Sequence, residues 1–283
     1  MRTAAIIGAG DLGGAVARTL AMREAVERIV LIDPSGSVAA GKALDIQQSG
    51  AIAGFHTRLR GATDISHAVG CDVCILADRA GASTGSAAED PGAIAVLGAN
   101  DAAPIVFAGA SHARLLWRAA DHLRIDRRRL IGSAPEALAS AIRALVALEA
   151  GCAPGEVMLT VLGAPPDGFV VPWSEASIGG SAVQQVLSPV QMGRLDDRIA
   201  RLWPPDAQAL GAAAATVAEG ILRSARRAFN VLTVLDGELG VRRRVASLPS
   251  LLSAGGIVQR RVPSLNARER TRLDTVLERQ SLG

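Results

Sequence analysis

Three glycines near the amino terminus constrain this chain more than any other feature. Gly8, Gly10 and Gly13 form a G-x-G-x-x-G pattern that follows the apolar segment 3–7 and precedes the segment 15–25, whose apolar residues have helical spacing. In such a turn the first glycine permits a tight bend, the second lets a ligand approach the backbone, and the third lets the helix pack closely on the strand. The sequence therefore predicts a strand, a glycine turn and a helix at the start of the chain.

A second apolar segment, 28–32, completes a βαβ unit and ends at Asp33. Asp33 lies twenty residues beyond Gly13, where a carboxylate accepts hydrogen bonds from a ribose diol and repels a 2′-phosphate. The free N–H groups of the helix amino terminus suit a pyrophosphate. The pattern thus predicts an NAD site rather than an NADP site, formed by the three glycines, Asp11, Leu12 and Asp33. We expect the Asp11 side chain to point to solvent or to cap the helix.

Composition narrows the classes of function. Hydrophobic residues make up 49% of the 283 residues and charged residues 20%, as in a globular protein. The net charge is +3, and Lys42 is the only lysine. Aromatic residues make up 2% and tyrosine is absent, which argues against a single-strand nucleic-acid binder. That scarcity leads us to expect no nucleic-acid partner. No apolar run reaches the roughly 20 residues of a membrane span, and no signal sequence precedes the glycine turn, so we expect no membrane partner either.

The three cysteines are too few and too odd in number for a disulfide framework. Cys71 and Cys74 form a C-x-x-C pattern, but no second pair could complete a zinc site, and the segment 73–76 is typical of a buried strand. We therefore expect Cys71 and Cys74 to be core residues. We also expect no metal site and a cytoplasmic protein.

Strand-like and helical segments alternate through the first half of the chain, and the pattern changes near Gly132. Further strands are expected at 57–60, 72–77, 104–108 and 130–131, with helices at 38–48 and 112–123. Beyond Gly132 we expect helices at 135–150 and 266–280, and a helical region between 182 and 224 that breaks at Pro204 and Pro205. We expect strands at 156–162 and 169–171, and two more within 231–248. The alternation predicts a doubly wound parallel sheet. We infer a dinucleotide-binding domain at 1–132 and a second domain at 133–283.

Several short segments at both ends of the chain form a set. They are 6–13, 31–33, 41–46, 236–240, 248–249, 255–257 and the helix from Asn266. Together they resemble the malate/lactate dehydrogenase family over nearly the whole chain. The resemblance implies an amino-terminal Rossmann domain, a carboxy-terminal α+β domain, an NAD cofactor and a small 2-oxo or 2-hydroxy acid as substrate. It also implies a homodimer or homotetramer, with the helix at 41–48 in the subunit interface.

The catalytic positions of that family can be located in this sequence. The histidine that takes the hydroxyl proton would lie between Gly163 and Asp167, and its place holds Pro165. Leu138 stands in the place of the aspartate that orients this histidine, and Ala141 in the place of the arginine that binds the substrate carboxylate. A proline, a leucine and an alanine cannot transfer a proton or pair with a carboxylate.

The loop that follows the segment 72–77 differs from the family in the same way. Ala82 and Ala88 occupy the places of its arginines, and Ala110 replaces an asparagine near nicotinamide and substrate. Asp78 and Arg79 replace a turn of small residues that lies against the cofactor in that family. Arg79 could bind the pyrophosphate, fill the nicotinamide pocket or extend to solvent. We include it among the predicted cofactor-binding residues.

The histidines offer one catalytic candidate. His112 follows the strand at 104–108, at the sheet edge where ligands bind, although a surface position at the start of a helix is the favoured interpretation. The other histidines are expected to be structural or solvated: His56, His67 and His122. Arg143 lies two residues beyond Ala141, which turns it by about 200° around a helix, so it is not an obvious substitute.

Three functions follow from these observations. The favoured hypothesis is a divergent family member that keeps NAD binding but does not carry out ordinary 2-hydroxy-acid dehydrogenation. Such a protein would act as a binding or regulatory module, or would catalyse a changed reaction. The alternative is an active NAD-dependent 2-hydroxy-acid oxidoreductase with rearranged residues, for which His112, Arg79 and Arg143 would converge. The third is a structural or interaction protein.

Overall fold

A mixed β-sheet runs through the molecule, and its amino-terminal part is wholly parallel. The computed structural model describes residues 2–81, 91–99 and 103–280. The six parallel strands are β1 (Thr3–Ile7), β2 (Arg28–Ile32), β3 (Arg58–Ala62), β4 (Val73–Leu76), β5 (Ile105–Phe107) and β6 (Leu130–Gly132). They lie in the order β3-β2-β1-β4-β5-β6, which is the order of a doubly wound dinucleotide-binding fold.

The sheet continues into the second half of the chain with antiparallel strands. β12 (Ala228–Asp236) joins β6 through Leu232 and Gly132, and the order continues β12-β13-β8-β9, with β14 on β13. The added strands are β13 (Arg242–Ser253), β14 (Gly256–Arg260), β8 (Leu162–Gly163) and β9 (Phe169–Val170). A second sheet, in the order β11-β10-β7, contains β7 (Val157–Met158), β10 (Ser177–Ile178) and β11 (Ser181–Ala182). The predicted fold class is confirmed, whereas the domain boundary at 132 stays a prediction.

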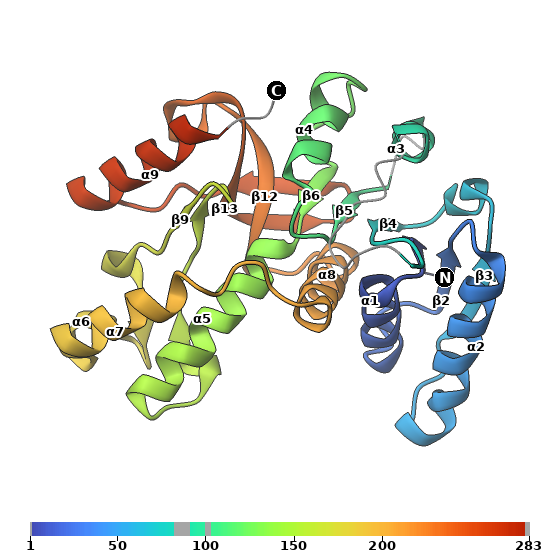
Figure 1. Cartoon of the computed structure of the whole chain (residues 1–283), viewed down its shortest axis with the longest axis horizontal. Helices are drawn as coiled ribbons and strands as arrows, with labels where there is room; N and C mark the ends of the chain where they lie inside the picture. Colours follow the sequence, from blue (N-terminus) through green and yellow to red (C-terminus); the bar gives the residue numbers. More distant parts are fainter. Residues whose placement is uncertain (1, 82–90, 100–102, 281–283) are drawn as a thin grey trace.

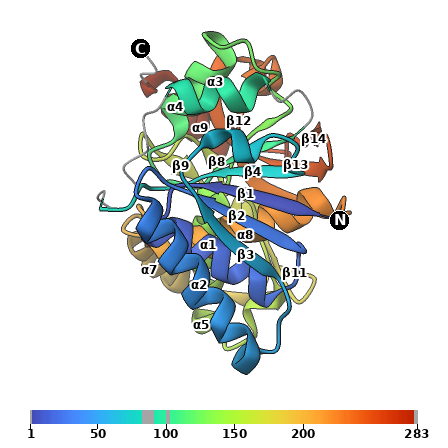
Figure 2. The same cartoon turned by 90° about the vertical axis from the view of Figure 1, so that its right-hand side faces the viewer.

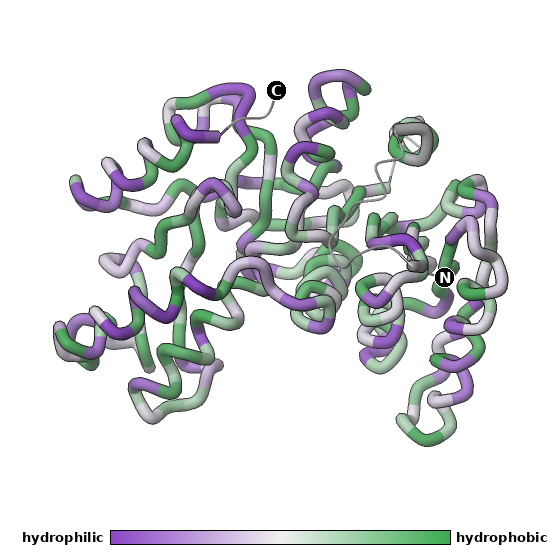
Figure 3. Tube along the Cα trace, viewed as in Figure 1, coloured by the Kyte–Doolittle hydropathy of each residue, from purple (hydrophilic) through white to green (hydrophobic). Residues whose placement is uncertain are grey.

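Helices cover both faces of the parallel strands, so strands such as β1 and β4 are apolar along almost their whole length. Figure 2 shows α3 and α4 above the sheet, and α1, α2, α5 and α8 below it. The helices are α1 (Asp11–Met22), α2 (Gly36–Ala53), α3 (Pro91–Ala99), α4 (Ala113–Asp121), α5 (Ala134–Ala150), α6 (Val183–Val186), α7 (Pro189–Ile199), α8 (Ala207–Leu222) and α9 (Ala267–Arg279). Figure 3 shows hydrophobic residues along the central strands and hydrophilic residues over much of α9.

Two predicted elements are divided in the structure. The expected helical region between 182 and 224 breaks at Ser188 and Pro189 as well as at the predicted prolines, because proline disfavours helix in the residue before it. Ser188 then caps α7 by accepting the N–H of Gln191. The expected strand at 156–162 becomes β7 and β8, which belong to different sheets.

Cys71 and Cys74 are buried and free, as predicted for core residues. Burial raises the pKa of the Cys74 thiol to about 12, which makes it an inert thiol at neutral pH. Among the described residues, no helix combines the length and the apolar character needed to cross a membrane.

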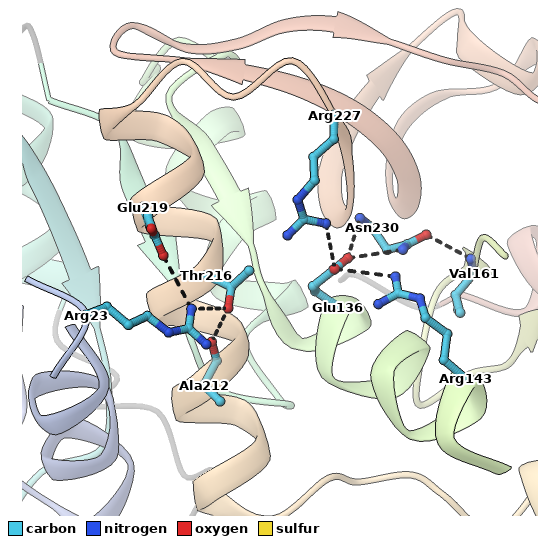
Figure 4. A network of polar contacts seen from close by, with 9 residues as sticks. All are labelled: Arg23, Glu136, Arg143, Val161, Ala212, Thr216, Glu219, Arg227 and Asn230. Atoms are coloured by element: carbon cyan, nitrogen blue, oxygen red, sulfur yellow. Dashed lines mark hydrogen bonds and ion pairs between the residues drawn. The ribbon is translucent and has the colours of Figure 1, made fainter. Parts of the chain in front are cut away.

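A buried polar network fixes the start of α5 to the antiparallel strands (Figure 4). Asn230 in β12 donates its backbone N–H and its Nδ2 to Glu136 Oε2, at 2.9 and 3.1 Å. Arg143 and Arg227 approach Glu136 Oε1 at 3.4 and 3.5 Å. Asn230 Oδ1 in turn accepts the N–H of Val161 at 2.9 Å. The Glu136 network therefore joins three segments that are far apart in sequence, and the sequence analysis did not find it.

Replacing Glu136 by alanine should lower the free energy of unfolding by about 3 kcal/mol, because the buried Asn230 groups lose their acceptor and two arginines lose their counter-ion. Urea denaturation followed by circular dichroism measures this loss. Glu149→Ala is the matched control, since Glu149 lies on the same helix but is only partly buried, and it should change stability by less than about 0.5 kcal/mol. Equal effects of the two substitutions would contradict the role of the network.

Candidate functional site

The glycine turn lies between β1 and α1, against the end of β4. Gly8 has a φ of +108° and donates its N–H to Ile32 O at 2.7 Å. A Cβ atom on Gly8 would lie 2.2 Å from the carbonyl oxygen of Asp78, and one on Gly13 would lie 2.0 Å from the carbonyl oxygen of Gly8. The first and third glycines are therefore required by close backbone packing, as predicted.

The amino terminus of α1 is capped by a carboxylate from another part of the chain. Gly10 is the N-cap residue and offers no side chain to the helix. The N–H groups of Leu12 and Gly13 donate instead to Asp78 Oδ2 and Oδ1, at 3.3 and 3.1 Å. Asp78 is only 1% exposed, and a Cβ on Gly10 would lie 2.5 Å from its Cγ. The Asp78 carboxylate thus occupies the position at which a helix amino terminus in this fold offers N–H groups to a phosphate.

Asp33 lies at the end of β2, and its carboxylate binds backbone on three sides. Its Oδ2 accepts the N–H groups of Ala9 and Ala80, each at 2.9 Å, and its Oδ1 accepts that of Ser35 at 2.9 Å. Asp33 is 2% exposed. In this conformation the carboxylate joins the glycine turn to the segment after β4, rather than facing solvent.

The other predicted turn residues have different surroundings. Asp11 is exposed in the first turn of α1, and Arg79 is half-buried beside Asp78. The sequence analysis missed Lys42, which donates from Nζ to Gly10 O at 2.7 Å. Its status as the only lysine in the chain was a signal that could have singled it out.

The residues that the sequence resemblance assigns to catalytic places are apolar and buried where the structure describes them. Pro165 is buried in the segment between β8 and β9, and Leu138 is fully buried in a hydrophobic cluster with Ile142 and Val146. Ala110 is also buried in the core. The two alanines at the loop-arginine places, Ala82 and Ala88, lie outside the described residues. The side chains of Pro165, Leu138 and Ala110 themselves can neither exchange a proton nor pair with a carboxylate.

The expected surface position of His112 is wrong. His112 is 1% exposed, its Nδ1 accepts the N–H of Gly109 at 3.1 Å, and its ring packs edge-on against Phe107. Helix α4 begins one residue later, so His112 turns back towards the end of β5 rather than outwards. Burial lowers the pKa of His112 to about 4. The remaining histidines are exposed, as predicted: His56, His67 and His122.

Arg143, one of the two arginines proposed to act with His112, has another partner. Arg143 pairs with Glu136 in the network described above. His112 instead contacts the backbone after β5. The described contacts therefore give Arg143 and His112 different partners, which does not favour a rearranged catalytic centre.

The lowered pKa of His112 has a consequence for stability. A histidine that is neutral in the folded state but titrates near pH 6.5 when unfolded contributes stability above that pH, and loses it as the pH falls towards 4. The full contribution is about 3 kcal/mol. Urea denaturation between pH 4 and pH 7 should show that His112→Asn flattens this decline, whereas His122→Asn, at an exposed position, should leave it unchanged. A decline of unaltered slope in His112→Asn would contradict the assignment.

Comparisons with known proteins give a consistent result. No family model matches the chain. The malate dehydrogenase of Salinibacter ruber is 28% identical over 289 residues, which cover 95% of this chain and 92% of that protein. The malate dehydrogenase of Cytophaga hutchinsonii is 27% identical over 299 residues, which cover 95% and 93% of the two chains.

Solved structures match along almost the entire chain. The S. ruber malate dehydrogenase has a TM-score of 0.85 at 25% identity, with 97% of this chain and 93% of that chain covered. The malate dehydrogenase of Aeropyrum pernix has a TM-score of 0.86 at 20% identity, covering 97% and 95%. A Cryptosporidium parvum lactate dehydrogenase, solved with lactic acid and nicotinamide adenine dinucleotide, has a TM-score of 0.86 at 21% identity, covering 98% and 95%. These relatives and structures together support membership of this chain in the malate/lactate dehydrogenase family.

Proposed function

We propose that this chain is a dinucleotide-responsive member of its family that does not carry out ordinary 2-hydroxy-acid dehydrogenation. The observation that carries the proposal is that Pro165 and Leu138 are buried and apolar, since the sequence resemblance assigns them to the places of the catalytic histidine and its aspartate. Dehydrogenation of an alcohol needs a group that takes the hydroxyl proton while the hydride leaves. Neither side chain can do so, and the buried His112, with its pKa of about 4, is a poor base at neutral pH.

The proposed ligand is NAD or NADH. The β1-turn-α1-β2 framework supports this choice, since Gly8, Gly10 and Gly13 shape the turn and Asp33 ends β2. Asp11, Leu12 and Arg79 complete the residues that would hold the cofactor. The observed conformation does not fit the whole molecule, because the Asp78 carboxylate stands at the pyrophosphate position.

The proposal extends to the setting of the protein. Helix α2 exposes Val38, Leu44 and Ile52, which supports its use as a subunit interface of a homodimer or homotetramer. The free cysteines among the described residues support a cytoplasmic location. A small 2-oxo or 2-hydroxy acid is the proposed second ligand, on the basis of the family alone.

Purified protein should not oxidise NADH with oxaloacetate or pyruvate at an ordinary enzymatic rate, which is about 1 to 10³ s⁻¹. The reason is the absence of a proton-transferring group at Pro165 and Leu138. Absorbance of NADH at saturating 2-oxo acid measures the rate, and an active malate dehydrogenase added to the same mixture serves as the control. Turnover within the ordinary range would disprove the proposed loss of dehydrogenation.

Cofactor preference gives a separate prediction. NADH should bind at least about tenfold more tightly than NADPH, a difference of about 1.4 kcal/mol, because Asp33 would lie beside the 2′-phosphate of NADPH and repel it. Isothermal titration calorimetry with up to millimolar ligand measures both affinities. Equal affinity for NADH and NADPH would contradict the proposed position of Asp33 beside the ribose. Failure of both ligands to bind would favour a structural or interaction protein.

A further inference from the structure

We propose that Asp78 is a built-in competitor of the dinucleotide, which occupies the pyrophosphate position with its own carboxylate and has to leave before a dinucleotide binds. The inference rests on the proposed function, since it concerns the same site. It assigns to Asp78 the control of affinity at that site, a role that goes beyond the cofactor-binding residues named above.

The geometry at α1 supports this role. A helix amino terminus offers N–H groups that lack partners within the helix, and two of them, from Leu12 and Gly13, already donate to Asp78. The backbone oxygen of Asp78 also accepts the N–H of Gly10 at 3.0 Å. Donors in the turn that would face a pyrophosphate are therefore engaged by a single residue.

The space beside Gly10 in the glycine turn is filled by the Asp78 carboxylate. Gly10 lacks a Cβ, and an added Cβ would lie 2.5 to 2.6 Å from three atoms of the Asp78 side chain. In a dinucleotide site this glycine lets the backbone approach the pyrophosphate. Here the same clearance accommodates Asp78, so a pyrophosphate and the carboxylate cannot occupy it together.

Charge strengthens the exclusion. A carboxylate and a pyrophosphate are both anions, and they would compete for the same N–H groups and the same helix dipole. If a ligand binds only the conformation in which Asp78 has moved away, its apparent affinity is the intrinsic affinity multiplied by the fraction of molecules in that conformation. Wild-type protein is therefore expected to bind NADH weakly.

The hydrogen bond from Ala80 to Asp33 links the two ends of the site. Asp33 Oδ2 accepts the N–H of Ala80, two residues after Asp78, and also that of Ala9 in the glycine turn. Movement of the segment 78–80 away from α1 would break the Ala80 contact and free one lone pair of Asp33 for a ribose hydroxyl. Departure of Asp78 and exposure of Asp33 are thus expected to occur together.

The test compares Asp78→Ala and Asp78→Asn with the wild type and with Asp45→Ala. Asp45 lies on α2, three residues after Lys42, and is exposed and outside the proposed cofactor-binding residues, so Asp45→Ala controls for the loss of one negative charge. Calorimetry measures the binding of NADH and, separately, of inorganic pyrophosphate, which needs the anion position but not Asp33. Asp78→Asn keeps the size of the side chain, so it provides the test if Asp78→Ala does not fold.

Asp78→Ala should bind NADH at least about tenfold more tightly than the wild type, equivalent to about 1.4 kcal/mol, with Asp78→Asn intermediate and Asp45→Ala within about twofold of the wild type. Equal NADH affinities of the wild type and both Asp78 variants would overturn the inference but leave NAD binding intact. An equal gain in Asp45→Ala would also overturn it, since general charge would then explain the effect. If Asp78→Ala gains pyrophosphate binding but no protein binds NADH, the inference stands and the proposed cofactor is wrong. If neither ligand binds to any protein, both are wrong.

Discussion

The close approach of α1 to β1 and β4 is the constraint on which this site depends. A side chain on Gly13 would collide with the backbone of Gly8, and one on Gly8 would collide with the backbone of Asp78. The approach aims the first N–H groups of α1 at whatever residue follows β4. A small residue at position 78 would leave these N–H groups free to bind a ligand, whereas the Asp78 carboxylate accepts hydrogen bonds from two of them. The packing that builds a dinucleotide site in this fold therefore also enables the chain to cap that site.

The second half of the molecule keeps its architecture with different polar contacts. Leu138, which the sequence resemblance assigns to the place of a catalytic aspartate, joins the apolar cluster of α5. Glu136, two residues earlier, supplies a buried carboxylate in another direction, towards Asn230 and two arginines. Buried charges are costly unless they are paired. The Glu136 carboxylate is paired with two arginines and joins α5 to β12. These contacts stabilise the fold without taking part in dehydrogenation, which the proposed function lacks.

Much of the fold could be predicted from local patterns. The apolar strands, the glycine turn and the alternation of strands and helices predicted the doubly wound parallel sheet, and short segments predicted the family. Local patterns failed where a single residue has two plausible environments. His112 before a helix looked like a surface residue, but Gly109 and Phe107 enclose it at the end of β5. Ser188 and Pro189 began a new helix inside a region whose composition was helical throughout.

The sequence by itself determined the βαβ unit and the place of Asp33 at the end of β2, and it supplied the apolar residues that the resemblance assigns to catalytic places. These are properties of residue type and spacing along one segment. Only the tertiary structure decided which partners the polar groups take. Gly13 and Asp78 are 65 residues apart, and Glu136 and Asn230 are 94 apart, and each pair meets only because the sheet brings its strands side by side. The conformation of the glycine turn, held by the Asp78 carboxylate, follows from such a long-range contact and from no local pattern.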